Sequence, residues 1–193
     1  MNLNTEKCIE GWTNSLCQLR IKADIAFFGD SLTFWGDYAS VFPDKVVCNL
    51  GLRGDTLEGM VKRVEQVACV NPECVFIMGG INDVSVISPD EFGNLYSTLV
   101  DKVFELHSKP RVFLQSILPV NEHCFGAISC NNSQIRVANR IIKNIANNKH
   151  ISFLDLFSLY ELNGELKPEF SKDGIHLKQH AYKIWYDLIK AII

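Results

Sequence analysis

The stretch DIAFFGDSL, residues 24–32, decides the fold because it joins an apolar run directly to a polar turn. The apolar run is continuous rather than alternating, which is typical of a strand covered on both faces. It ends at Gly29, and Asp30 and Ser31 follow at once. Asp30 or Ser31 could simply cap a following helix. The alternative is that Ser31 is a nucleophile, held at the end of a buried strand.

Four further apolar runs follow along the chain, and helix-length amphipathic segments separate them. The further strands are expected at residues 45–50, 73–78, 111–117 and 150–155, and the helices at 5–19, 56–67, 89–107, 132–147 and 180–192. The helical segments carry apolar residues at spacings of three and four. This alternation predicts an α/β fold, a three-layer α/β/α sandwich around a central parallel five-stranded sheet. The stretch 120–129 lacks a clear period and is expected to be a loop.

Length and composition indicate one domain, residues 1–193, with an ample core. The chain has 47% hydrophobic residues and a formal net charge of −3. The chain has no excess of basic residues, so no nucleic-acid partner is expected. No apolar run reaches the roughly 20 residues of a membrane span. Residues 1–12 lack the apolar segment of a secretory signal, so a cytoplasmic location is expected for the chain as given.

The cysteines are odd in number and form no C-x-x-C pair. They are Cys8, Cys17, Cys48, Cys69, Cys74, Cys124 and Cys130. A chain of this length does not need cross-links, so we expect most of them to be reduced, small buried apolar residues. A disulfide between Cys124 and Cys130 across a loop is the alternative. No Cys/His cluster has the ligand spacing of a zinc site, and no metal is expected.

A serine nucleophile needs a base, and the sequence offers His176 three residues after Asp173. The intervening glycine at position 174 allows a tight turn, which can bring the Asp173 carboxylate to Nδ1 of the imidazole. The alternative is an ordinary Asp-Gly turn before the last helix. Among the other histidines, only His123, in the irregular loop, is a credible base.

An oxyanion hole needs donors aimed at one point, and three turns that follow strands could supply them. The candidates are the backbone N–H of Ser31, the backbone N–H of Gly51 and the side-chain amide of Asn82. In open parallel sheets, ligands bind beyond the carboxyl ends of the strands, where these turns lie. Alternatively, Asn82 is a plain turn residue.

Four short blocks together resemble the SGNH, or GDSL, family of serine esterases and lipases. They are GDSL at 29–32, NLGLRGDT at 49–56, GIND at 80–83 and DGIH at 173–176. They occur in the family's order, and the likeness spans nearly the whole chain. The resemblance implies a flavodoxin-like three-layer fold and no cofactor.

The resemblance also implies roles for the residues of these blocks. Ser31 would be the nucleophile, His176 the base and Asp173 its orienting acid. Ser31 N–H, Gly51 N–H and the Asn82 amide would form the oxyanion hole.

The function that the resemblance implies is hydrolysis of an ester through an acyl-enzyme. We expect a short acyl group, most simply acetyl, because a chain of 193 residues leaves little room for a lid or a long acyl tunnel. The likeness is greatest to the platelet-activating-factor acetylhydrolase branch and to bacterial acetylesterases, so the substrate could be an acylated carbohydrate or a lipid. A lysophospholipase or thioesterase with the same triad, and a non-catalytic binding member of the fold, are the alternatives. A homodimer is possible.

Three charged residues of the same turns are candidates for substrate binding. They are Asp30, Arg53 and Asp83. Arg53 could touch a substrate oxygen or, alternatively, pair with Asp55 or Asp83. The aromatic residues Phe34, Trp35 and Tyr38, just after Ser31, could wall a small pocket, although such a stripe near a helix start is often core.

Overall fold

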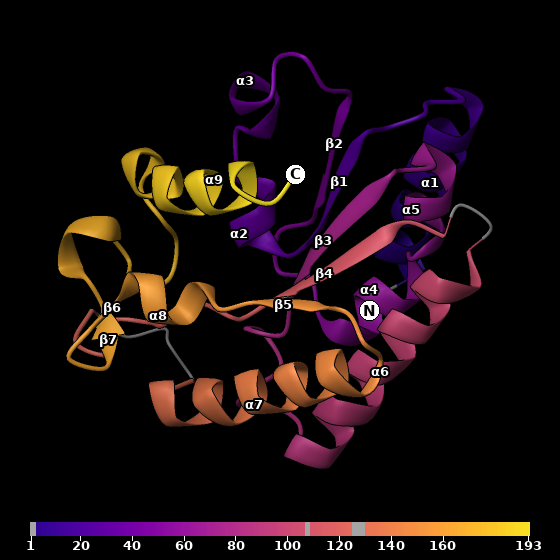
Figure 1. Cartoon of the computed structure of the whole chain (residues 1–193). Helices are drawn as coiled ribbons and strands as arrows, with labels where there is room; N and C mark the ends of the chain where they lie inside the picture. Colours follow the sequence, from indigo (N-terminus) through magenta and orange to yellow (C-terminus); the bar gives the residue numbers. More distant parts are fainter. Residues whose placement is uncertain (1–2, 107–108, 125–129) are drawn as a thin grey trace.

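The computed structural model describes residues 3–106, 109–124 and 130–193 and has a central sheet of five parallel strands (Figure 1). The strands are β1 (Ile25–Gly29), β2 (Val47–Gly51), β3 (Cys74–Met78), β4 (Arg111–Gln115) and β5 (Ser152–Leu154). Their order is β2-β1-β3-β4-β5. This is the order of flavodoxin-like doubly wound sheets, and it confirms the predicted fold class.

Helices cover both faces of the sheet and define two hydrophobic cores (Figure 1). One face carries α1 (Leu3–Gln18), α4 (Leu57–Lys62), α5 (Glu65–Val70), α6 (Pro89–Glu105) and α7 (Asn132–Asn148). The other carries α2 (Ser31–Phe34), α3 (Tyr38–Val41), α8 (Leu156–Tyr160) and α9 (Tyr182–Lys190). A small hairpin, β6 (Glu161–Leu162) and β7 (Glu165–Leu166), follows α8, and short 3₁₀ turns lie at Pro168–Phe170 and Gln179–Ala181.

The register of the strands brings three polar turns to one edge of the sheet. Gly29, the last residue of β1, lies opposite Gly51 at the end of β2 and Met78 at the end of β3. Because all three strands run in parallel, the turns that follow them share the carboxyl edge. Ser31 and Asn82 lie in two of these turns.

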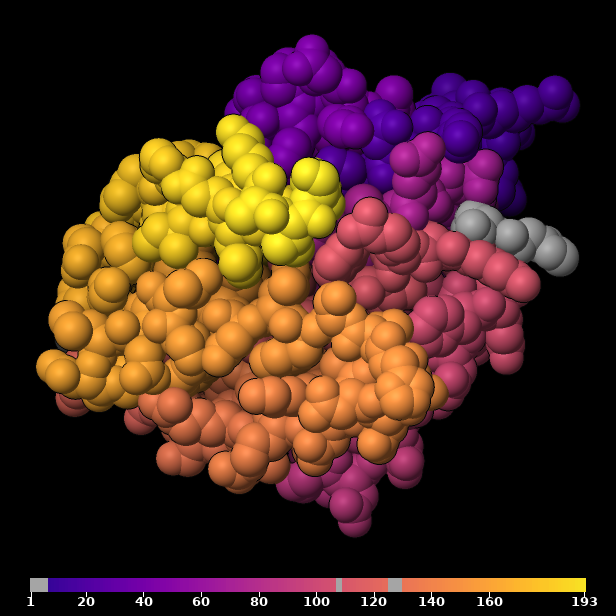
Figure 2. Space-filling model, viewed as in Figure 1, coloured from indigo at the N-terminus to yellow at the C-terminus, as the bar shows by residue number. Residues whose placement is uncertain are grey.

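The chain closes on itself through α9. In the space-filling view, the yellow C-terminal helix lies against the violet segment around α3 (Figure 2). Tyr186 of α9 packs edge-on against Tyr38 with ring centroids 5.6 Å apart, and its hydroxyl accepts a hydrogen bond from Asp37 N–H at 2.7 Å. None of the described helices is both long and apolar enough to cross a bilayer.

The predicted helix at 56–67 is in fact two helices. α4 ends at Lys62 and α5 begins at Glu65, and the side chain of Arg63 between them points into the core. Apolar periodicity continues across the break, so the pattern could not reveal it. The short elements α3, α8 and the β6–β7 hairpin were not predicted, because each is too short to show a period. Residues 107 and 125–129, parts of a predicted helix and loop, lie outside the described residues.

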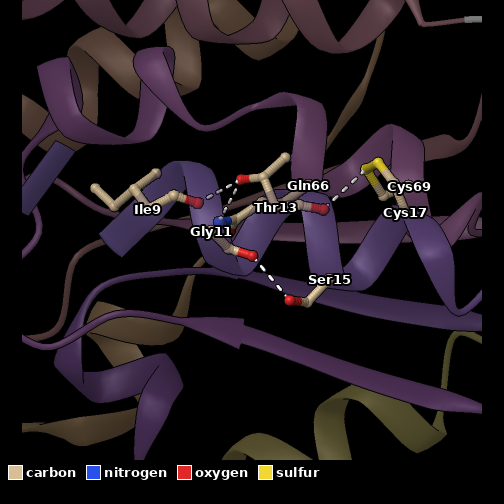
Figure 3. Close-up of a disulfide and its surroundings, with 7 residues drawn as sticks. All are labelled: Ile9, Gly11, Thr13, Ser15, Cys17, Gln66 and Cys69. Atoms are coloured by element: carbon tan, nitrogen blue, oxygen red, sulfur yellow. Dashed lines mark hydrogen bonds between the residues drawn. A yellow bond between two sulfur atoms is a disulfide. The ribbon is translucent and has the colours of Figure 1, made fainter. Parts of the chain in front are cut away.

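Most of the cysteines are free thiols, as expected, but one pair is oxidised. A disulfide joins Cys17 of α1 to Cys69 of α5 (Figure 3). Next to it, the Gln66 side-chain amide donates to Thr13 Oγ1 at 3.1 Å, which ties the same two helices together. The partners are 52 residues apart in sequence, and only the packing of α1 on α5 brings them together. Cys124, by contrast, is a free thiol and does not pair with Cys130.

Candidate active site

The turn after β1 uses its two polar residues for different tasks. Asp30 is the N-cap of α2, and its Oδ1 accepts a hydrogen bond from Leu32 N–H at 3.0 Å. Ser31 is therefore not needed as a cap. Its own N–H has no acceptor among the described residues. Gly29 has no room for a side chain, since a Cβ there would lie 2.1 Å from Met78 O, and β1 and β3 can approach closely at this point.

A chain of hydrogen bonds runs from Ser31 to the loop before α9. Ser31 Oγ lies 2.9 Å from His176 Nε2, and His176 Nδ1 lies 2.6 Å from Asp173 Oδ2. With Nδ1 protonated and donating to the carboxylate, Nε2 is free to accept the serine proton. This is the geometry of a nucleophile, a base and an orienting acid.

The Asp173–His176 pair is built by a local turn. Asp173 Oδ1 accepts hydrogen bonds from the N–H groups of Ile175 at 3.0 Å and His176 at 2.8 Å, and Gly174 adopts a φ of +85°. A left-handed φ favours glycine at this position. Partial burial acts to raise the pKa of Asp173, but the hydrogen bonds from the His176 ring and from these N–H groups lower it to about 2. Asp173 is thus ionised at neutral pH.

Ser171 supports this turn and was not singled out from the sequence. Its buried Oγ lies 3.1 Å from Asp173 Oδ1 and 2.7 Å from the His176 carbonyl oxygen, and it accepts a hydrogen bond from Gly174 N–H at 3.0 Å. A serine two residues before an Asp-Gly turn is too common to be a signal. The structure gives it contact with both ends of the Asp173–His176 turn.

Of the three expected oxyanion donors, Ser31 N–H and one hydrogen of the Asn82 amide have no acceptor among the described residues, whereas Gly51 N–H already has one. The Asn82 side-chain amide donates to Asp55 O at 2.8 Å, which leaves its second hydrogen free, since an amide nitrogen carries two. Gly51 N–H instead donates to Asn49 Oδ1 at 2.9 Å. The role of Gly51 is one of space: a Cβ there would lie 2.2 Å from Phe34 N, so glycine lets α2 pack on β2.

Gly54, in the same turn after β2, offers a backbone donor that was not predicted from the sequence. It is exposed, has a φ of +69°, and its N–H has no acceptor among the described residues. Its neighbour Asp55 provides the carbonyl that orients Asn82. The block 49–56 contains two glycines, and nothing in their spacing showed which N–H is free.

Two of the candidate substrate-binding residues are buried instead. Asp30 caps α2, and both oxygens of Asp83 accept from Leu57 N–H, at 3.2 and 3.1 Å, at the start of α4. Burial raises the pKa of Asp30 to about 7 and that of Asp83 to about 6. The two carboxylates hold the turns of the site together, and their burial keeps them from a substrate.

Arg53 is exposed and pairs with neither of the carboxylates considered for it. Its guanidinium lies 5.3 Å from the centroid of the Trp35 ring, while Asp55 binds the buried Arg63. Trp35 and Phe34 are both exposed beside Ser31. Tyr38, in contrast, is buried and stacks on Phe27 at 3.6 Å, so it belongs to the core.

His123 does not approach the serine. Its side chain is 87% exposed, and its Nε2 lies 3.2 Å from Glu165 Oε1 of the β6–β7 hairpin. Among the described residues, His176 is the histidine in contact with Ser31.

Comparison with known proteins agrees with this architecture. Three similar solved structures are a Streptococcus pneumonia protein whose name refers to platelet activating factor, a GDSL-like lipase from Bacteroides thetaiotaomicron and an acetyl xylan esterase. Their TM-scores are 0.83, 0.75 and 0.72, at 22%, 24% and 21% identity. The aligned regions cover 99%, 96% and 88% of this chain and 99%, 95% and 99% of the other chains.

At this level of identity the similar structures show the fold. No curated protein matches the sequence closely enough to identify a relative. The sequence profile of the GDSL-like lipase/acylhydrolase family, however, matches residues 27–184. This match runs from the middle of β1 into α9 and includes Ser31, Asp173 and His176. The protein therefore belongs to the GDSL-like lipase/acylhydrolase family of carboxylic ester hydrolases.

Proposed function

We propose that the protein is a serine esterase that removes a short acyl group, most simply acetyl, from an acylated carbohydrate through an acyl-enzyme intermediate. The observation that carries the proposal is the continuous chain of hydrogen bonds from Ser31 Oγ to His176 and on to Asp173, at 2.9 and 2.6 Å.

In the first half of the reaction, Ser31 Oγ attacks the ester carbonyl while His176 Nε2 takes the serine proton. The ionised Asp173 stabilises the imidazolium that forms. The negative oxygen of the tetrahedral intermediate accepts hydrogen bonds from Ser31 N–H and the free amide hydrogen of Asn82, with Gly54 N–H as the third donor.

In the second half, His176 returns the proton to the leaving alcohol as the bond between the carbonyl carbon and the alcohol oxygen breaks. Water then attacks the acyl group on Ser31, and His176 takes a proton from that water. Collapse of the second tetrahedral intermediate releases the carboxylic acid, and His176 protonates Ser31 Oγ to restore the starting state.

The exposed aromatic surface next to Ser31 supports a carbohydrate as the alcohol. Trp35 lies four residues after Ser31 and carries Arg53 over its ring. The flat Trp35 ring can hold the apolar face of a sugar, and the neighbouring Arg53 guanidinium can donate hydrogen bonds to the hydroxyl groups of that sugar. One of the similar structures is an acetyl xylan esterase, and an acetylated sugar chain is the substrate class that this surface suits.

One cavity favours a second candidate, an esterase for longer acyl chains. It has a volume of about 210 Å³ and a mainly apolar lining, formed by residues 84–87, the start of α6 with Phe92, and Gln134, Val137, Ala138 and Ile141 of α7. The loop 84–87 continues directly from Asn82 and Asp83. A medium-length acyl chain that entered here would be favoured over acetyl.

The two candidates are separated by hydrolysis of p-nitrophenyl esters from acetate to decanoate, with wild type and Ser31→Ala side by side. Ser158→Ala is a matched control, because Ser158 is exposed on α8 and its Oγ donates to the carboxylate of Asp155. We expect kcat/KM to fall with chain length, Ser31→Ala to be inactive and Ser158→Ala to match wild type. A maximum at longer chains would favour the second candidate, and equal rates for Ser31→Ala and wild type would contradict both.

A further inference from the structure

A fully buried arginine lies beneath the proposed site. Arg63 separates α4 from α5, and its side chain has 0% exposure. Burying a charge is costly unless it is paired and hydrogen-bonded. Its side-chain neighbours are Asp55, whose Oδ2 accepts from Nε at 2.7 Å, and Gln66, whose Oε1 accepts from Nη1 at 2.9 Å.

The guanidinium also binds the backbone of two strands at the point where they end. Nη2 donates to Gly29 O at 2.9 Å, and Nη1 donates to Leu50 O at 2.8 Å. Gly29 is the last residue of β1, and Leu50 is the penultimate residue of β2. One planar group therefore fixes the carboxyl ends of two neighbouring strands relative to each other.

These contacts lead to both halves of the reacting centre. Gly29 lies two residues before Ser31, so the hydrogen bond to its carbonyl fixes the start of the turn that carries Ser31. On the other side, Asp55 is held through its side chain by Arg63 and binds the Asn82 amide through its backbone oxygen at 2.8 Å. Arg63 thus connects to Ser31 through Gly29 and Asp30, and to the Asn82 amide through Asp55.

Aromatic rings and a cross-linked helix keep this group away from water. The guanidinium carbon lies 4.3 Å from the centroid of the Phe28 ring and 5.9 Å from that of Trp12. Trp12 belongs to α1, the helix that the Cys17–Cys69 disulfide ties to α5 (Figure 3). In a site with little water, the direction of each hydrogen bond of Arg63 is well defined.

From these contacts we infer that Arg63 is a positioning residue of the esterase site, which sets the distance between Ser31 and the side-chain amide of Asn82. The inference rests on the proposed function. A forked guanidinium can bind two carbonyls and a carboxylate at once, which a lysine ammonium cannot do with the same geometry. Misplacement of reacting groups by about 1 Å costs on the order of 100-fold in rate.

The test must separate positioning from stability, because removal of one partner of a buried ion pair destabilises a protein. The double variant Asp55→Asn/Arg63→Met removes both charges, and the side-chain amide oxygen that it places at position 55 can still accept from Thr56 N–H. Arg63→Lys keeps the charge pair but loses the fork, and provides a folded protein if the double variant does not fold. Arg111→Met is the matched control, since Arg111 is exposed at the amino end of β4.

For each variant, we would measure the melting temperature, kcat and KM for p-nitrophenyl acetate, and the rate at which a fluorophosphonate labels Ser31. We expect kcat and the labelling rate to fall by about 10- to 100-fold in both Arg63 variants, with KM within about threefold of wild type and a cooperative melting transition. A folded Arg63 variant with wild-type kcat would overturn the inference.

Ser31→Ala, run in parallel, distinguishes failure of the inference from failure of the proposed function. If Ser31→Ala is inactive while folded Arg63 variants are fully active, only the role of Arg63 is wrong. If Ser31→Ala keeps wild-type activity, the proposed function fails, and the inference fails with it.

Discussion

The two halves of the proposed triad are held in opposite ways. Ser31 is 7% exposed, and the contacts around its turn come from residues far along the chain, through Arg63 and β3. The side chains of His176 and Asp173 are 39% and 56% exposed. Their geometry comes from hydrogen bonds within residues 171–176. One half depends on the core, and the other depends on a local turn.

This difference has consequences for both activity and stability. Substitutions in the local turn should reduce activity while leaving the core intact. Substitutions of the charged groups beneath Ser31 should affect activity and stability together, because these groups are buried. The following four predictions test this contrast, from the largest expected effect to the smallest.

His176→Ala should lower kcat by about 10⁴- to 10⁶-fold, because the base is lost. Its melting temperature should stay close to that of wild type, since the side chain is partly exposed and its removal leaves no buried cavity. His180→Ala is the matched control: His180 is exposed near α9 and lies against Phe170. Steady-state kinetics and thermal melting would check both. A near wild-type rate in His176→Ala would show that another group is the base.

Asn82→Ala should lower kcat by about 10²- to 10³-fold, the usual effect of losing one oxyanion donor. The effect should appear in kcat, because the hydrogen bond strengthens as charge develops on the oxygen. Steady-state kinetics with p-nitrophenyl acetate would measure it. A change confined to KM would mean that Asn82 binds the substrate and does not stabilise the oxyanion.

Stability should decrease as pH rises from 3.8 to about 7, because the carboxyl groups of Asp30 and Asp83 are buried. Folding raises the pKa of Asp30 from 3.8 to about 7 and that of Asp83 from 3.8 to about 6. Between pH 3.8 and these raised pKa values, the folded state binds more protons than the unfolded state. The free energy of unfolding therefore falls with rising pH. For Asp30 the change is roughly 2–4 kcal/mol.

The exposed pair, Asp173 and His176, contributes a pH dependence of stability with the opposite sign. The lowered pKa of Asp173 gives stability that is lost only as pH falls below 3.8 toward 2. Thermal melting from about pH 4.5 to 8 would therefore report mainly on the buried carboxylates. In Asp30→Asn/Asp83→Asn, which keeps acceptors for the Leu32 and Leu57 N–H groups, the dependence should flatten. An equally steep curve in this variant would contradict the assignment.

Ser171→Ala should have the smallest effect, a fall in kcat of roughly 10-fold with little change in KM. Its hydroxyl contacts Asp173 and the His176 carbonyl, so its loss leaves the triad present but less well oriented. Kinetics with short esters would test this. Unchanged kcat in a folded Ser171→Ala protein would show that the Asp173–Gly174–His176 turn needs no further support.

The fold could be predicted from the sequence because its main elements are periodic and separated by turns. The five apolar runs all became strands of one parallel sheet. The burial of Arg63 between α4 and α5 could not be predicted, because a charged residue on a helix is expected to face solvent. Its burial depends on Asp55 and on two backbone carbonyls, which come together only in the folded chain.

In the site, too, contacts between residues close in sequence were easier to predict than contacts that depend on the folded conformation. The Asp173–His176 turn is local in sequence, so its spacing indicated that the two side chains could meet, with an ordinary Asp-Gly turn as the alternative. Gly51 was expected to be an oxyanion donor, but its N–H is taken by Asn49. That bond depends on the conformation of the turn, which spacing does not specify. The Cys17–Cys69 disulfide and Ser171 were missed for related reasons: the first depends on tertiary packing, and the second has a common local sequence.

The central claim is that Ser31 carries the acyl group, and intact-protein mass spectrometry followed by peptide mapping tests it most directly. The protein would be mixed with excess p-nitrophenyl acetate and quenched in acid within the first turnovers, with Ser31→Ala treated identically. The account predicts one added acetyl group on the peptide that contains Ser31, and none at that peptide in the variant. Rapid ester hydrolysis with no acetyl group on Ser31, or with the label on another residue, would contradict it.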